Sequence, residues 1–354
     1  MAGFDPRALL DVPPFPSDRY ARLADRLAAI VGTKSDVLLV QGEAIVALEA
    51  SATSLARPGL KALNIVTSPY GTMYGSWLRR GGADVTDLYA QPGMPIEAAA
   101  AENAFGIGDF DLVALVHAES ATGILNPLPE IATLARARGA LLVVDAVASA
   151  GGHALDVDRL GIDICAIGPQ KSLGGPAGIS ALTVSPAAWR ALERTGAPTG
   201  SVLSLLDHKR LWLDSGRGAL PGMPSALEWH ALSAALDRFE AEGIDAAVAR
   251  HAVAGKATRA AVRALGLPLW IADDAKASNL VTVVRDAEAV VSRPAIAEAG
   301  IDPAVGVAGL IRLNHTGERA RRPAVEAMID ALCSALGSKP DAARAAIAAA
   351  YEGG

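Results

Sequence analysis

Short apolar runs alternate with helical segments over the first two thirds of the chain. An apolar run of about four to eight residues between turn residues is typical of a buried strand, and apolar positions three or four residues apart are typical of a helix. The alternation predicts a mostly parallel sheet, an α/β fold with helices on both faces. The predicted strands are 37–40, 62–66, 85–88, 112–116, 141–144, 162–167 and 179–184, and the predicted helices between them are 17–31, 44–56, 71–80 and 127–138.

The pattern changes near Ser225, where two long helical segments replace the alternation. Two further strands and two further helices follow, and they predict a small α+β domain at the C-terminus. We therefore expect an N-terminal arm over residues 1–16, a large domain over 17–240 and a small domain over 241–354. The predicted elements of this last part are helices 225–242 and 244–265, strands 279–284 and 309–313, and helices that begin at Pro323 and Pro340.

Composition excludes several classes of protein. Half of the 354 residues are apolar and the net charge is -6, so no basic stripe marks a nucleic-acid surface. The two cysteines provide no disulfide framework. No run reaches the roughly 20 apolar residues of a membrane span, and the N-terminus lacks a signal-peptide pattern. We expect a cytoplasmic protein whose partners are small molecules.

Polar side chains stand where the predicted parallel strands end. Glu43, Tyr70, Ser120, Asp145 and Lys171 all lie at or just after such ends. Ligands bind beyond the carboxyl ends of the strands in an open parallel sheet. The sequence therefore predicts that these side chains share one site.

Lys171 and Asp145 together indicate a particular chemistry. Lys171 stands before a Gly/Pro-rich loop, and Asp145 ends a buried strand. A lysine forms a Schiff base with an aldehyde, and a carboxylate keeps a pyridine nitrogen protonated so that the ring accepts electrons. Each residue alone would suit an ordinary loop or turn, but the pair predicts a site for vitamin B6.

Three ordered segments, 115–128, 144–152 and 168–178, resemble the class V aminotransferases of fold type I. The resemblance implies that Lys171 is the Schiff-base lysine and proton shuttle and that Asp145 pairs with the ring nitrogen. It implies that Arg312 binds the substrate carboxylate, for which a guanidinium fork is suited. Other vitamin-binding positions follow from the same resemblance, with no metal: Tyr70 stacked on the ring, Ser120 and Thr122 near its phenolic oxygen, and Gly42, Glu43, Ala44 and Gln170 around the phosphate position.

The phosphate position departs from the pattern of that family. A carboxylate, Glu43, replaces a hydroxyl in the loop that opens a helix, and Pro169 and Met223 stand where donors are usual. A phosphate about 4 Å from Glu43 would be repelled by roughly 4 kcal/mol per pair of unit charges at an effective dielectric constant near 20. We therefore expect weak binding of phosphorylated vitamin B6.

One branch of the family shows the same departure and uses unphosphorylated vitamin B6 as a substrate. The chain resembles that branch in Gly42-Glu43, Gly168-Pro169, Ser204–Asp207 and Ala249–Ala252, among other stretches. The implied reaction moves an amino group from free pyridoxamine to a small oxo acid such as pyruvate, giving pyridoxal and L-alanine. The same resemblance implies no tightly bound cofactor and a homodimer with its sites at the interface.

Two alternatives stay open. The first is an aminotransferase of alanine–glyoxylate or serine–glyoxylate type that uses pyridoxal 5'-phosphate, for which Arg217 or Lys209 would have to supply phosphate donors. The second is a protein that binds vitamin B6 without turnover. The second arginine that the branch places before Arg312 has no counterpart, because Asp302-Pro303-Ala304 occupy that stretch.

Overall fold

The computed structural model describes residues 6–194, 196–285, 294–304 and 307–353. Its central feature is a sheet with the strand order β1-β7-β6-β5-β4-β2-β3. The strands are β1 (Asp36–Gln41), β2 (Lys61–Val66), β3 (Asp84–Tyr89), β4 (Leu112–Val116), β5 (Leu141–Asp145), β6 (Ile164–Ile167) and β7 (Ile179–Val184). Each predicted strand of this part is confirmed to within two residues.

The sheet is mostly parallel, as the sequence predicts. The neighbouring strands β3, β2, β4, β5 and β6 all run parallel. Val116 lies beside Asp145, and Asp145 lies beside Ala166. β7 pairs antiparallel with both β6 and β1, so β1 runs in the same direction as β6. The carboxyl ends of β1, β2, β4, β5 and β6 therefore meet at one edge.

Helices pack against this sheet, α1 on β1, α2 on β6 and β7, α3 on β2 to β4, and α5 on β5. The helical elements of this part are η1 (Pro6–Leu9), η2 (Ser17–Arg19), α1 (Tyr20–Val31), α2 (Ala44–Leu55), α3 (Pro69–Arg80), α4 (Ala98–Ile107), α5 (Leu128–Arg138), α6 (Val157–Leu160), α7 (Pro186–Leu192), α8 (Leu205–His208), η3 (Lys209–Leu213) and α9 (Ala226–Glu242). The sequence did not predict η1, α4, α6, α7, α8 or η3. α4 is an alanine-rich segment with little periodicity, and α6 and α8 are single turns.

Two apolar cores lie on either side of the junction between α9 and α10 (Ile244–Ala264). The larger core extends from Phe15 to Ala247, and the second extends from Ala254 to Ala350. The second core lies under a sheet of order β8-β10-β9, in which both pairs are antiparallel. Its elements are η4 (Asp274–Lys276), β8 (Val281–Arg285), α12 (Pro294–Glu298), β9 (Ile301–Pro303), β10 (Leu310–Asn314), η5 (Gly317–Ala320), α13 (Arg322–Leu336) and α14 (Asp341–Glu352).

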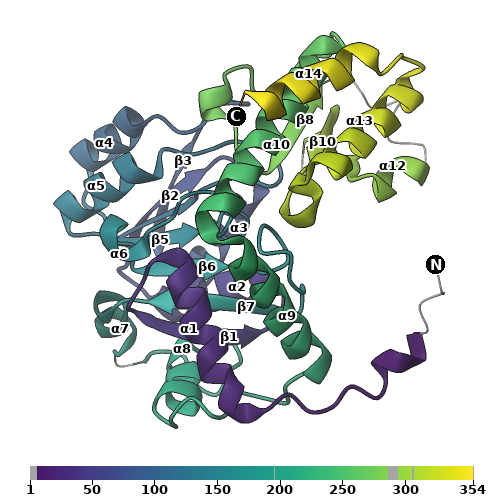
Figure 1. Cartoon of the computed structure of the whole chain (residues 1–354). Helices are drawn as coiled ribbons and strands as arrows, with labels where there is room; N and C mark the ends of the chain where they lie inside the picture. The colour runs from purple at the N-terminus through teal and green to yellow at the C-terminus, as the bar shows by residue number, and fades with distance from the viewer. Residues whose placement is uncertain (1–5, 195, 286–293, 305–306, 354) are drawn as a thin grey trace.

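Figure 1 shows α9 and α10 running from the large sheet to this C-terminal unit, with α10 beside α14. Gly243 joins the two helices at a φ of 85°, which a residue with a side chain rarely adopts. The predicted domain boundaries at residues 16 and 240 stay predictions. Phe15, in the predicted N-terminal arm, packs on Tyr20 and Trp229 of the larger core. Among the described residues, no helix is long and apolar enough to cross a membrane.

Candidate active site

A cavity of about 190 Å³ opens at the carboxyl edge of the large sheet. Its walls are mainly apolar, and its polar groups come from five different strand ends. They lie together although up to 128 residues separate them along the chain, from Glu43 to Lys171. The lining residues are Glu43, Ala44, Ile45, Leu48, Tyr70, Val116, Ala118, Glu119, Ser120, Asp145, Val147, Ala148 and Lys171.

Lys171 lies in a tight turn after β6. Its amide donates to the Gly168 carbonyl at 3.2 Å, and its own carbonyl accepts from the Gly174 amide at 3.0 Å. Burial lowers the pKa of the Lys171 amine, and the positive charge of Arg312 lowers it further. The neutral amine, which is the nucleophilic form, is therefore more abundant than on an exposed lysine.

Asp145 is the last residue of β5 and faces the same cavity. Its Oδ1 accepts from the Val147 amide at 2.9 Å. Burial raises the pKa of Asp145 to about 6, against the opposing effects of this hydrogen bond and of Lys171. Near neutral pH the carboxylate is mostly ionised, which pairing with a protonated ring nitrogen requires.

Glu43 caps the N-terminus of α2. Its Oε2 accepts from the Ile45 amide at 2.8 Å, and its Oε1 accepts from Gln170 Nε2 at 2.5 Å. Gly42 lies behind it, with its carbonyl accepting from Ser180 Oγ at 3.0 Å. The carboxylate therefore occupies the helix N-terminus where an anionic ligand would otherwise bind.

Tyr70 belongs to the first turn of α3, where the Ser68 hydroxyl accepts from the Tyr70 amide at 3.2 Å. Burial raises the pKa of Tyr70, which therefore stays un-ionised at neutral pH. The ring lines the cavity beside Asp145 and Lys171. It provides an apolar face for a flat ligand.

Arg312 lies on β10, outside the cavity lining. Its Nη1 donates to the Ser120 carbonyl at 2.8 Å, and its Nη2 lies 3.5 Å from Asp302 Oδ2. Its Nε has no hydrogen-bond partner among the described residues. The guanidinium thus retains Nε as a donor without a partner among the described residues, while Asp302 pairs with its Nη2.

Besides Arg312 and Gly42, two further predicted positions do not line the cavity. Thr122 is buried and lines a neighbouring cavity of about 560 Å³ with Tyr89 and Trp270, rather than the one around Lys171. Gln170 does not line the cavity but reaches it through its hydrogen bond to Glu43.

Glu119 is the polar lining residue that the sequence did not predict. It is fully buried, its Oε1 accepts from Thr67 Oγ1 at 2.6 Å, and its Oε2 has no partner among the described residues. Burial raises the pKa of Glu119 to about 7. The signal in the sequence was a lone carboxylate directly before Ser120, at the end of a buried strand.

Comparisons with known proteins give a consistent family. A model of the class-V aminotransferases matches residues 17–302. Pyridoxamine–pyruvate transaminase of Mesorhizobium japonicum is 32% identical over 346 residues, which cover 95% of this chain and 88% of that protein.

Solved structures agree with that match. Pyridoxamine–pyruvate aminotransferase from Mesorhizobium loti aligns with a TM-score of 0.85 at 28% identity, covering 98% of this chain and 93% of that one. Alanine–glyoxylate aminotransferase from Nostoc sp. aligns with a TM-score of 0.84 at 26% identity, covering 93% and 91%. These likenesses extend over both apolar cores.

The raised pKa of Glu119 predicts a pH-dependent loss of stability. The folded chain holds this proton at a pH where the unfolded chain has released it, so stability falls as pH rises from about 4.5 to about 7. Glu119→Gln removes the titration but keeps an acceptor for Thr67. The variant's gain in free energy of unfolding should grow by on the order of 2 kcal/mol between about pH 5.5 and about pH 8.5.

Thermal melting of both proteins across this pH range measures the effect, and Glu102→Gln at an exposed position is the control. A difference between wild type and Glu119→Gln that does not change with pH would contradict the raised pKa.

Proposed function

The chain belongs to the class-V aminotransferases, and within this family we propose that it moves an amino group between free pyridoxamine and a small oxo acid such as pyruvate. The products would be pyridoxal and L-alanine. Its 32% identity to a pyridoxamine–pyruvate transaminase supports this choice of substrates. The observation that carries it is the position of the Glu43 carboxylate at the start of α2.

Glu43 fits a hydroxymethyl group better than a phosphate. Both of its oxygens already accept hydrogen bonds, from Ile45 and Gln170, and each keeps a further lone pair. A free 5′-hydroxymethyl group could donate to one of them, whereas an ionised phosphate offers no donor. Glu43 is exposed in the single chain, so the repulsion of a phosphate at about 4 Å lies between roughly 1 kcal/mol in water and roughly 4 kcal/mol at a dielectric constant near 20.

The cations that would have to bind a phosphate have other partners. Arg217 pairs with Asp25 at 2.6 Å and Lys209 with Glu193 at 2.5 Å, both within the same chain. Met223, where the family has a donor, is 93% exposed and apolar. This arrangement disfavours the alternative that depends on pyridoxal 5'-phosphate held at this position.

The remaining lining residues fit the vitamin ring. Vitamin B6 supplies an aldehyde or amine on a pyridine ring that accepts electrons when its nitrogen is protonated. Asp145 would hold that proton, Tyr70 would cover one face of the ring, and Lys171 Nζ would bond to the aldehyde and carry the proton during amino transfer. The apolar walls, including Leu48 and Val147, would exclude water.

Arg312 would bind the carboxylate of the oxo acid. It stands beside Ser120 and keeps Nε without a partner among the described residues. The pairing of Arg312 with Asp302 favours a small acceptor with a single carboxylate, because a second carboxylate would approach Asp302.

We further propose that the protein works as a cytoplasmic homodimer without a tightly bound cofactor. The family resemblance supports the dimer, and the exposed Met223 segment gives the site a surface that a second chain could cover. Use of pyridoxal 5'-phosphate as a resident cofactor, with glyoxylate as the oxo acid, is the outcome that would replace the proposal.

Turnover tests the proposal directly. Purified protein mixed with pyridoxamine and pyruvate should form pyridoxal and L-alanine without added phosphorylated cofactor. Lys171→Ala should abolish the reaction, because no other lining residue supplies an amine, while Lys256→Ala on the exposed surface should leave it unchanged. A wild type active only with pyridoxal 5'-phosphate and an amino acid would overturn the proposal.

Glu43 should set the preference between the two forms of the vitamin. Wild type should bind pyridoxal more tightly than pyridoxal 5'-phosphate, and Glu43→Ser should move this ratio towards the phosphate form by at least about fivefold. Absorbance titrations with both compounds measure the ratio. Glu43→Gln keeps the size of the side chain and removes its charge, so it should show most of the same shift; if it behaves as wild type, the charge of Glu43 is not the cause.

A further inference from the structure

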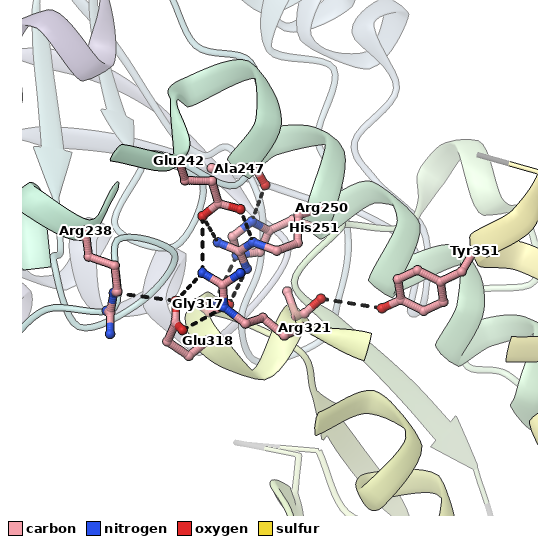
Figure 2. A network of polar contacts seen from close by, with 10 residues as sticks. Arg238, Glu242, Ala247, Arg250, His251, Gly317, Glu318, Arg321 and Tyr351 are labelled. Atoms are coloured by element: carbon pink, nitrogen blue, oxygen red, sulfur yellow. Dashed lines mark hydrogen bonds and ion pairs between the residues drawn. The ribbon is translucent and has the colours of Figure 1, made fainter. Parts of the chain in front are cut away.

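Two consecutive residues of α10 bind both polar atoms of a single glycine. His251 Nε2 accepts from the Gly317 amide at 2.9 Å, and Arg250 Nη1 donates to the Gly317 carbonyl at 2.5 Å. Figure 2 shows these side chains meeting the turn that holds Gly317. Neither Arg250 nor His251 lines the cavity around Lys171.

Gly317 lies directly on the backbone of Lys171. At a φ of 63° it comes so close that an added Cβ would stand 2.9 Å from the Lys171 carbonyl oxygen and 3.5 Å from the Gly174 Cα. A side chain here would be strained by the backbone conformation and would also collide with the lysine turn. The position of Gly317 therefore limits where the Lys171 turn can lie.

The same segment carries Arg312. Gly317 follows β10 after only two intervening residues, and Arg312 stands in the middle of that strand. Lys171 comes from the large sheet, whereas Arg312 comes from the C-terminal sheet. The contact of Gly317 with the lysine turn is thus one of the points that fix the position of one sheet relative to the other at the site.

The hydrogen bonds of His251 require one tautomer of the neutral ring. Its Nδ1 lies 2.7 Å from the Ala247 carbonyl and must donate to it, which leaves Nε2 as the acceptor for the Gly317 amide. The ring is fully buried. Burial lowers the pKa of His251 to about 4, so this tautomer persists at neutral pH.

Arg250 is oriented by Glu242 at the end of α9. The carboxylate accepts from Nε at 2.5 Å and from Nη2 at 2.9 Å, and this fork–fork geometry directs Nη1 towards Gly317. A second connection runs beside it, because Arg238 donates to the Gly174 carbonyl at 2.8 Å and lies 3.5 Å from Glu318. The lysine turn is therefore tied to both α9 and η5.

We propose that Arg250 and His251 are positioning residues, which clamp Gly317 against the Lys171 turn and so fix Lys171 relative to Arg312. The clamp rests on the proposed function for its effect on catalysis, but its effect on the lysine turn does not depend on the substrate. A displacement near 1 Å of a group that positions substrate can cost about a hundredfold in rate.

Paired variants test the clamp. Arg250→Met and His251→Phe remove the two hydrogen bonds at similar side-chain volume, while Arg250→Lys and His251→Gln restore a donor and an acceptor. Arg263→Met is the matched control, since Arg263 lies on the same helix and pairs with Asp274 but does not contact Gly317.

Hydrogen exchange of the peptide that contains residues 171–175 is the first measurement. Arg250→Met and His251→Phe should speed its exchange at least about tenfold, because the turn loses its support. Arg250→Lys, His251→Gln and Arg263→Met should stay near wild type. If His251→Phe does not fold, Arg250→Met decides the result, since its side chain lies nearer the surface.

Kinetics are the second measurement. Arg250→Met should lower kcat and raise the KM for the oxo acid together, each by about tenfold, while the Kd for pyridoxal changes by less than about threefold. The ring contacts come from the large sheet alone, so they should persist. Unchanged exchange of residues 171–175 in folded Arg250→Met would overturn the clamp, whatever the kinetics of the variant.

Failure of the proposed function gives a different result. If the wild type does not use pyridoxamine, the kinetic measurement cannot be made. Hydrogen exchange of residues 171–175 would still decide whether the clamp exists. Unchanged exchange in Arg250→Met with full wild-type turnover would instead remove the clamp and leave the function standing.

Discussion

The common direction of the strands is the constraint on which the site depends. β1, β2, β4, β5 and β6 all end at one edge of the large sheet, and each sends a polar residue into the same cavity. A reversed strand would carry its residue to the opposite edge, as β7 does. The lysine, the aspartate and the helix cap can therefore meet only because long crossovers return the chain to the same side.

Glu43 caps a helix, and under the proposed function the same side chain would also select the ligand. The first amides of a helix need acceptors, and the Glu43 carboxylate supplies one to Ile45. In doing so it occupies the place at a helix N-terminus that suits a phosphate. The bond from Gln170, the residue before Lys171, ties this cap to the lysine turn. The helix cap and the lysine turn are thus parts of one arrangement, in which the charge of Glu43 would disfavour a phosphate.

The sequence predicted those parts of the molecule that depend on local pattern. Buried strands such as β4 and β5 are continuous apolar runs, and Lys171 and Asp145 stand at recognisable strand ends. The sequence predicted Pro127 as the first helical residue of α5, but the helix begins at Leu128 and Pro127 precedes it as the N-cap. The short strand β9 was not predicted, because three residues carry too little periodicity to be told from a loop.

Contacts between segments far apart in the chain could not be predicted from the sequence. The bond from Gln170 to Glu43 joins residues 127 positions apart, and Gly317 meets Lys171 only after the second sheet is placed on the first. Glu119 was overlooked because its role depends on burial rather than on spacing. Thr122 lies two residues beyond Ser120 yet lines another cavity, because the chain turns between them.

The most direct test is a competition between the two forms of the vitamin for the protein. Wild type is given equal concentrations of pyridoxal and pyridoxal 5'-phosphate, reduced with borohydride to fix whatever has bonded to a lysine, and digested for mass spectrometry. We expect a pyridoxyl group without phosphate on Lys171. A phosphopyridoxyl group on Lys171, or an adduct on another lysine, would contradict it.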